Sequence, residues 1–115
     1  MKNEPLFAIR SKIWIEDMEG HVVFGLGRYR ILKMIRRYGS MHAAAKHLRM
    51  SYRAVWMRIR TSEERIGKPL VVREGKGVKL TAFADRLIKQ FKRLHTIVEV
   101  ESDEVYDSLI SDHLS

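Results

Sequence analysis

The chain has 115 residues, 45% hydrophobic and 31% charged, which is the size of one compact domain with a core that needs no metal or disulfide support. The absence of cysteine excludes a disulfide framework and a cysteine-based zinc site, and no run approaches the roughly 18 apolar residues of a membrane span, so we expect a soluble cytoplasmic protein. The net charge of +8 favours a polyanionic partner, although ordinary solubility also explains an excess of Lys and Arg.

The first predicted elements are a β-ribbon and a helix. Residues 13–15 and 22–24 are short β-branched and aromatic runs around a polar turn that ends at Gly20, a pattern typical of a hairpin. Residues 28–38 place Ile31, Leu32 and Ile35 on one face of a helix, which Gly39 is expected to end.

A second helix and a short turn at residues 49–51 are predicted next. Ser40 is a suitable N-cap, and three successive alanines at 43–45 are small enough for a crossing helix to approach closely. Leu48 completes the buried face of this helix. Ser51 then caps a third helix.

The third helix has one inward and one outward side. Met50 is positioned to pack on Val55 as a hydrophobic staple. Spacings of four, three and four residues predict that one set points inward: Val55, Ile59, Ser62 and Ile66. The side chains left on the other faces are Tyr52, Arg53, Trp56, Met57 and Arg60.

A wing and a long fourth helix complete the pattern. Residues 70–73 and 78–80 form two short strands joined by a basic tip at 74–77. Thr81 caps a helix over about 82–100, whose wide apolar stripe predicts dimerisation contacts through Phe83, Leu87, Ile88, Phe91, Leu94 and Val98. The same periodicity also fits a stripe that serves only the core of its own chain.

The acidic residues concentrate at the C-terminal end. Residues 101–115 contain five Asp and Glu and no Lys or Arg, so residues 1–100 carry 22 basic against nine acidic residues, a balance of +13. Ser102 is predicted to start a short helix. We therefore divide the chain into a winged helix-turn-helix domain at 1–100 and an acidic tail or short helix at 101–115.

The segment SYRAVWMRI followed by LVVREGKGVKLT closely resembles the DNA-binding domain of ModE-type molybdate-dependent transcriptional regulators. The similarity extends through IWIE, FGLGRYRILKMI, GSMHAAAKHL and the helix from Ala82, and thus covers about residues 12–98. More distantly, the segment is similar to the winged helix-turn-helix of LysR-type regulators. The resemblance implies a mostly α fold with small β-hairpins: an N-terminal β-ribbon, a winged helix-turn-helix and a long C-terminal dimerisation helix. Regulators of this kind continue into molybdate-binding domains, whereas this chain ends at Ser115, so we expect no molybdate sensing.

Candidate DNA contacts come from the third helix, the helix N-termini and the wing. Arg53 and Arg60 lie two turns apart on the exposed side, and Arg binds a guanine edge bidentately. Tyr52 and Trp56 offer aromatic faces to DNA, with packing against the second helix as the alternative. The predicted contacts are Ser40, Arg49, Ser51, Tyr52, Arg53, Trp56, Met57, Arg60, Arg73, Lys76 and Lys79.

No enzymatic or cofactor site is predicted. His42 and His47 are five residues apart, which does not place them on one helix face, so no metal is expected. Gly75-Lys76-Gly77 lacks the Ser or Thr that follows the lysine of a phosphate-binding loop, and no catalytic constellation is evident.

These features predict a sequence-specific regulator that binds double-stranded DNA as a homodimer, with the third helix in the major groove and the wing on the backbone or minor groove. The alternative is a protein-interaction module that works with a separate effector-carrying chain.

Overall fold

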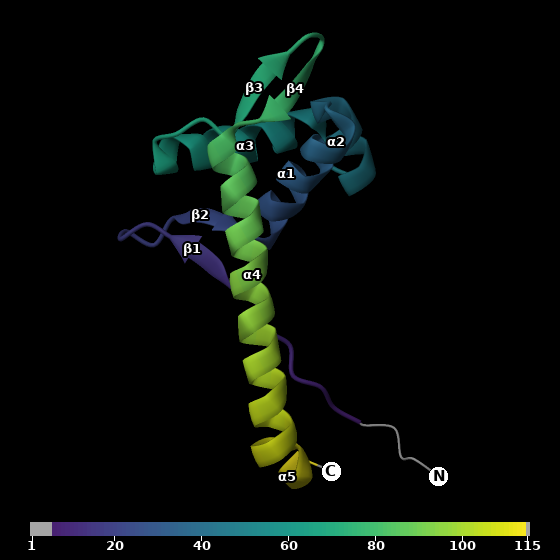
Figure 1. The fold of residues 1–115 in the computed structure, drawn as a ribbon, viewed down its shortest axis with the longest axis vertical. Helices are drawn as coiled ribbons and strands as arrows, with labels where there is room; N and C mark the ends of the chain where they lie inside the picture. Colours follow the sequence, from purple (N-terminus) through teal and green to yellow (C-terminus); the bar gives the residue numbers. More distant parts are fainter. Residues whose placement is uncertain (1–5, 115) are drawn as a thin grey trace. The chain divides into compact units, whose positions relative to one another are not determined.

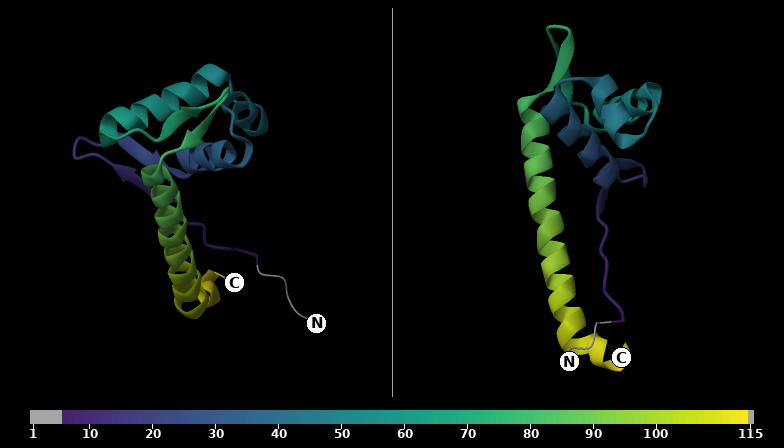
Figure 2. Two further views of the ribbon diagram at one scale, coloured as in Figure 1. Left: turned by 45° about the horizontal axis from the view of Figure 1, so that its top comes forward. Right: turned by 90° about the vertical axis from the view of Figure 1, so that its right-hand side faces the viewer.

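The computed structural model describes residues 6–114, which form two compact units (Figures 1 and 2). Residues 13–91 make up one unit, and the described residues 6–12 and 92–114 belong to the other. The elements follow in the order β1 (Trp14–Glu16), β2 (Val22–Gly25), α1 (Leu26–Tyr38), α2 (Met41–Leu48), α3 (Tyr52–Ile66), β3 (Val71–Glu74), β4 (Gly77–Leu80), α4 (Ala82–Val105), the π-helix η1 (Tyr106–Ile110) and α5 (Ser111–Leu114). The predicted mostly helical fold with two small hairpins is confirmed.

Each helix of the first unit ends or begins at the residue that the sequence indicates. Gly39 adopts a left-handed conformation with φ of 66°, and its N–H donates to the carbonyl oxygen of Ile35 at 2.7 Å, which ends α1. The hydroxyl of Ser40 accepts from the N–H of Ala43 at the start of α2. The other two predicted caps, Ser51 and Thr81, accept in the same way at the starts of α3 and α4.

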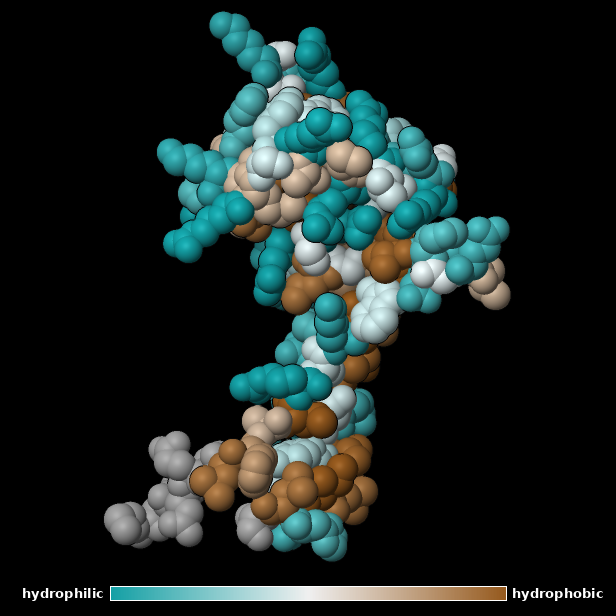
Figure 3. Space-filling view, turned by 180° about the vertical axis from the view of Figure 1, so that it is seen from behind, coloured by the Kyte–Doolittle hydropathy of each residue, from teal (hydrophilic) through white to brown (hydrophobic). Residues whose placement is uncertain are grey.

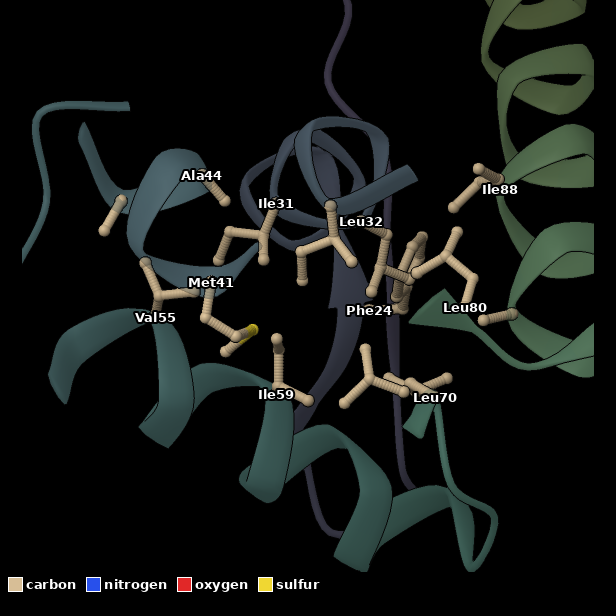
Figure 4. Packing of buried hydrophobic residues seen from close by; sticks show 14 of the residues in the cluster. Phe24, Ile31, Leu32, Met41, Ala44, Val55, Ile59, Leu70, Leu80 and Ile88 are labelled. Carbon is tan, nitrogen blue, oxygen red and sulfur yellow. The ribbon is translucent and has the colours of Figure 1, made fainter. Parts of the chain in front are cut away.

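The core lies where α1, α2 and α3 meet β2, the base of the wing and the first turns of α4 (Figure 4). Phe24, Ile31 and Val55 are fully buried there. Phe24 meets Phe91 edge to face, with ring centroids 5.1 Å apart. Ser62 is buried and fully satisfied, because its hydroxyl donates to the carbonyl oxygen of Val23 at 2.7 Å.

The wing is attached to the end of α1 as well as to α3. Strands β3 and β4 pair antiparallel, and the N–H of Val78 donates to the carbonyl oxygen of Gly39 at 3.1 Å. A Cβ at Gly77 would lie 2.2 Å from that same oxygen, so only glycine allows this approach. The wing projects from the layer formed by α2 and α3 (Figure 1).

The expected role of the α4 stripe requires a correction. Ile88 and Phe91 are 2% and 4% exposed, so their side chains belong to the core of their own chain and are not available to a second copy. Phe83 and Leu87 pack partly on the same core. Of the six predicted dimerisation residues, Leu94 is the most exposed, at 50%, and Val98 is half-buried.

The C-terminal unit continues the helix further than predicted. Residue 102 lies inside α4, so no new helix starts at Ser102. A π-helical turn follows over residues 106–110, then the single turn of α5. Apolar side chains are exposed along this unit (Figure 3): Leu94, Ile97, Val100, Val105, Leu109, Ile110 and Leu114.

Candidate nucleic-acid interface

The turn between α2 and α3 sets the direction in which α3 leaves the core. Arg49 ends α2 in a left-handed conformation with φ of 55°, the one described non-glycine residue with a positive φ. The N–H of Met50 donates to the carbonyl oxygen of Ala45 at 3.0 Å, which closes the turn. Met50 and Val55 both belong to the packed core, as the predicted staple requires.

The outward face of α3 is the central feature of the site. Val55, Ile59 and Ser62 are the buried positions of α3, as their spacing predicts. On the other side, Met57 is 57% exposed, and Arg53 and Arg60 are also exposed. Because Arg53 and Arg60 are seven residues apart, they lie about 10 Å apart along one side of the helix.

A groove of about 340 Å³ runs between the start of α2, α3 and the wing. The hydroxyl of Ser40 and the ring of His42 line it from α2, and Trp56 and Arg60 line it from α3. The wing contributes further basic groups, Arg73 from β3 and Lys76 from the turn between β3 and β4. The structure therefore brings together six of the predicted site residues: Ser40, Tyr52, Trp56, Arg60, Arg73 and Lys76.

Stacked aromatic rings connect α2 to α3 in this groove. The rings of His42 and Tyr52 stack with centroids 4.0 Å apart, and Tyr52 meets Trp56 edge to face at 6.2 Å. Trp56 is half-buried and packs against the core, while the guanidinium of Arg60 lies 4.8 Å from its ring centroid. Trp56 thus packs against the core on one side and lines the groove on the other.

Glu63 links the recognition face to the wing, a role that the sequence analysis did not identify. Its Oε2 accepts from the N–H of Leu70 at 2.8 Å and of Val71 at 3.4 Å. Its Oε1 lies 3.1 Å from Nη1 of Arg60. The carboxylate therefore fixes the start of the wing and orients a predicted DNA contact at the same time.

The other predicted contacts lie outside the groove. Arg49, Ser51 and Met57 are exposed on the turn and the outward face of α3. Lys79 lies on β4 outside the groove, and its Nζ is 3.7 Å from Oε1 of Glu74, an exposed pair across the wing. An exposed ion pair of this kind contributes little to stability, so Lys79 can readily exchange Glu74 for another anion.

The sequence of this fold matches the bacterial regulatory helix-turn-helix protein, lysR family, over residues 26–85, which span the helix-turn-helix, the wing and the start of α4. The chain belongs to the LysR family. Similar relatives of this LysR-family chain include the Molybdenum transport protein ModE of Azotobacter vinelandii, 36% identical over 87 residues that cover 71% of this chain and 31% of the relative. The Transcriptional regulator ModE of Haemophilus influenzae is 32% identical over 77 residues, which cover 63% and 30%. The chain thus spans about three-tenths of the length of these relatives.

Solved structures share the fold. The CbnR DBD–DNA complex has a TM-score of 0.60 at 22% identity and covers 71% of this chain and 94% of its own. ArgP from Mycobacterium tuberculosis has a TM-score of 0.53 at 31% identity and covers 65% of this chain and 28% of its own. The LysR family is one of transcriptional regulators, and the similarity to ModE that the sequence motifs indicate is confirmed.

Residues 6–114 contain no group of three His, Asp or Glu side chains placed to hold a metal ion. Within the same range, each helix is too short or too polar to cross a membrane.

Proposed function

We propose that this LysR-family chain is a transcriptional regulator that binds double-stranded DNA sequence-specifically as a homodimer. In this proposal α3 enters the major groove and the wing contacts the backbone or the minor groove. The observation that carries it is the outward face of α3, where Arg53, Met57 and Arg60 are exposed beside a groove shared with the wing.

The shape and charge of this surface support duplex DNA as the ligand. The major groove is about 12 Å wide and admits an α-helix. Arg53 and Arg60 supply guanidinium groups for base edges, while Arg73 and Lys76 on the wing supply positive charge for phosphates. The similar crystal structures include the CbnR DBD–DNA and BenM DBD/catB site 1 DNA complexes, in which domains of this fold bind DNA.

The N-terminus of α2 adds a site for a phosphate. Its backbone N–H groups point out of the helix near Ser40, whose hydroxyl already caps the N–H of Ala43. Other N–H groups of the first turn can donate to an anion there, since a helix leaves its first donors without intrahelical partners and Ser40 caps one of them. We propose that Ser40 and Ser51 mark backbone phosphate contacts at the starts of α2 and α3.

The homodimer is proposed from the second half of α4. Leu94, Ile97 and Val100 are each about half exposed, whereas a helix surrounded by water normally carries polar residues at such positions. We propose that a second copy covers them and that the dimer binds two half-sites, with its recognition helices about 34 Å apart in successive major grooves. Because genomic DNA is the proposed ligand, we also propose that the protein acts in the cytoplasm.

A second candidate function is a protein-interaction module that works with an effector-carrying chain. The exposed apolar residues of the C-terminal unit favour it, since Leu109 and Leu114 are 65% and 49% exposed and stand among acidic residues. Under this alternative, Arg53 and Arg60 have no role in the main interaction.

A salt titration with two duplexes tests the proposal. A duplex selected from a random pool and a scrambled duplex of the same composition are bound at several salt concentrations. The proposal expects at least a 10³-fold preference for the selected duplex, a ratio on the order of that found in specific complexes. Equal affinity for both would leave only polyanion attraction. Replacing Arg53 and Arg60 with Ala should remove the preference, and intact binding by this double variant would favour the protein-interaction alternative.

A further inference from the structure

A second group of basic side chains lies at the junction of β2, the start of α1 and the second half of α3. Nε of Arg28 donates to the carbonyl oxygen of Arg58 at 3.4 Å. Nη1 of Arg65 donates to the carbonyl oxygen of Val22. These bonds fix the guanidinium groups of Arg28 and Arg65, and the charges of both Arg58 and Arg65 act on Arg28. We term these three residues the arginine cluster: Arg28, Arg58 and Arg65.

The arginine cluster concentrates positive charge without acidic compensation. Burial lowers the pKa of Arg28, and the charges of Arg58 and Arg65 lower it further. The three guanidinium groups carry like charges, so they repel one another. Among residues 6–114, no Asp or Glu lies within ion-pair distance of the three guanidinium groups. An anion placed between them would relieve this repulsion.

The cluster occupies the flank of α3 opposite the wing. Arg58 and Arg65 are seven residues apart, so they share one stripe of the helix. Trp56, which lines the groove beside the wing, lies about 200° around the helix from Arg58. Exposed Met57 lies midway between these two flanks. If α3 points Met57 into a DNA groove, the flank of α3 beside the wing therefore faces one wall of the groove and the arginine cluster faces the other wall.

We propose that Arg28, Arg58 and Arg65 bind a backbone phosphate of duplex DNA on the wall of the major groove opposite the wing side of α3. This inference rests on the proposed function, because it assigns a phosphate contact within the same DNA complex. Guanidinium groups suit the role, since each presents paired N–H donors that match two phosphate oxygens. Contacts of this kind fix the position of a protein on DNA without reading its sequence.

The architecture of the cluster explains how three arginines share one anion. The side chain of Arg28 is half-buried and tied to α3, so it forms the inner part of the site, while Arg58 and Arg65 are exposed. The bond to Val22 restrains Arg65, which lowers the entropy lost when it contacts a phosphate. Because Arg58 and Arg65 are exposed, the backbone of a DNA strand has room to reach them.

The test replaces Arg58 with Gln in the full chain. The side chain of Arg58 forms no ion pair among the described residues, and the carbonyl oxygen that receives Arg28 remains in the variant. Arg86→Gln on α4 is the matched control, because Arg86 is also an exposed helical arginine and its loss changes the net charge equally. Binding to the selected and the scrambled duplex is measured over a range of KCl concentrations.

Arg58→Gln is expected to reduce the magnitude of the slope of log K against log salt for both duplexes, by at most about one unit, since one of the three cations at the phosphate is lost. The preference for the selected duplex should stay unchanged, and Arg86→Gln should keep the wild-type slope. Arg58→Lys retains the charge and should restore the slope. If Arg58→Lys does not restore the wild-type slope, the change in slope comes from altered packing and the proposal is overturned.

Other outcomes separate this inference from the proposed function. If Arg58→Gln keeps the wild-type slope while the Arg53 and Arg60 double variant loses sequence preference, the regulator stands and the arginine cluster is not a phosphate contact. Absence of duplex binding by the wild type would overturn both. The last measurement is the Tm of each protein with and without inorganic phosphate at constant ionic strength. If phosphate raises the Tm of the wild type but not of Arg58→Gln, and the two proteins have equal salt slopes on DNA, the site binds free phosphate and the DNA contact is rejected.

Discussion

Glu63 connects α3 to the wing, and its replacement with Ala is expected to destabilise the protein more than any other change on that helix's surface. The side chain of Glu63 is only 10% exposed. Its carboxylate receives the backbone N–H groups of Leu70 and Val71, the residues through which the chain enters β3. Alanine at this position removes Oε2, the oxygen that accepts both bonds, and leaves the two N–H groups without this partner.

The expected loss follows from these contacts. A hydrogen bond to a charged group contributes about 1.5–3 kcal/mol, and the bond to Leu70 has a short distance of 2.8 Å at a residue that is 1% exposed. The contact to Val71 is longer, at 3.4 Å, and the partner Arg60 is 65% exposed, so both add little. We expect a loss of about 2–3 kcal/mol for Glu63→Ala, or roughly 10–20 °C in Tm for a domain of this size.

Thermal and urea unfolding followed by circular dichroism measure this loss. Glu64→Ala is the matched control, because Glu64 is the exposed neighbour and its removal changes the charge equally. The control should stay within about 0.5 kcal/mol of the wild type. Glu63→Gln keeps one acceptor and should lose about half as much as Glu63→Ala. Equal destabilisation by Glu63→Ala and Glu64→Ala would refute the reasoning.

Three further predictions concern the wing, the core and the β1–β2 turn. Gly77→Ala brings a Cβ within 2.2 Å of the carbonyl oxygen of Gly39, so it should lower the free energy of urea unfolding by about 1–3 kcal/mol. The control is Gly27→Ala, whose Cβ meets no atom within 4 Å and which should be neutral or stabilising. Phe24→Ala empties a fully buried site and should cost about 3–5 kcal/mol in the same assay. A hydrogen bond from the backbone N–H of His21 lowers the pKa of Asp17, so the turn is stabilised above the ordinary aspartate pKa and loses this stabilisation as the pH falls through the lowered value. An NMR titration that gives Asp17 an ordinary pKa would contradict this last prediction.

Local chemistry was enough to predict several helix ends within residues 13–91, although the helix start expected at Ser102 was wrong. Gly39 and the caps Ser40, Ser51 and Thr81 were predicted because a helix end depends on residues within about four positions. The hydrogen bonds of these residues confirm the predictions. The inward side of α3 was also predicted correctly, since a helical period requires only spacing.

Contacts between distant residues were not predictable from spacing. Arg28 meets Arg58 and Arg65 across 30 or more positions, and Gly77 approaches a carbonyl that lies 38 residues earlier in the chain. Such meetings depend on how helices cross, which periodicity does not determine. The same limit explains the correction on α4: a stripe of apolar residues shows that a face is covered, but not whether Ile88 is covered by its own chain or by another.

The side chain of Arg60 shows how the fold prepares the proposed reading face. Its guanidinium lies over the ring of Trp56 and pairs with Glu63, both of which are fixed by the core or the wing. A side chain restrained in this way loses less rotamer entropy on binding than a free arginine. Arg53 forms no ion pair among the described residues, so it has to lose that entropy when it binds. Freeing Arg60 by Trp56→Leu should therefore weaken duplex binding even where the fold is retained, and because the recognition side chain itself is unchanged, the salt slope should stay the same.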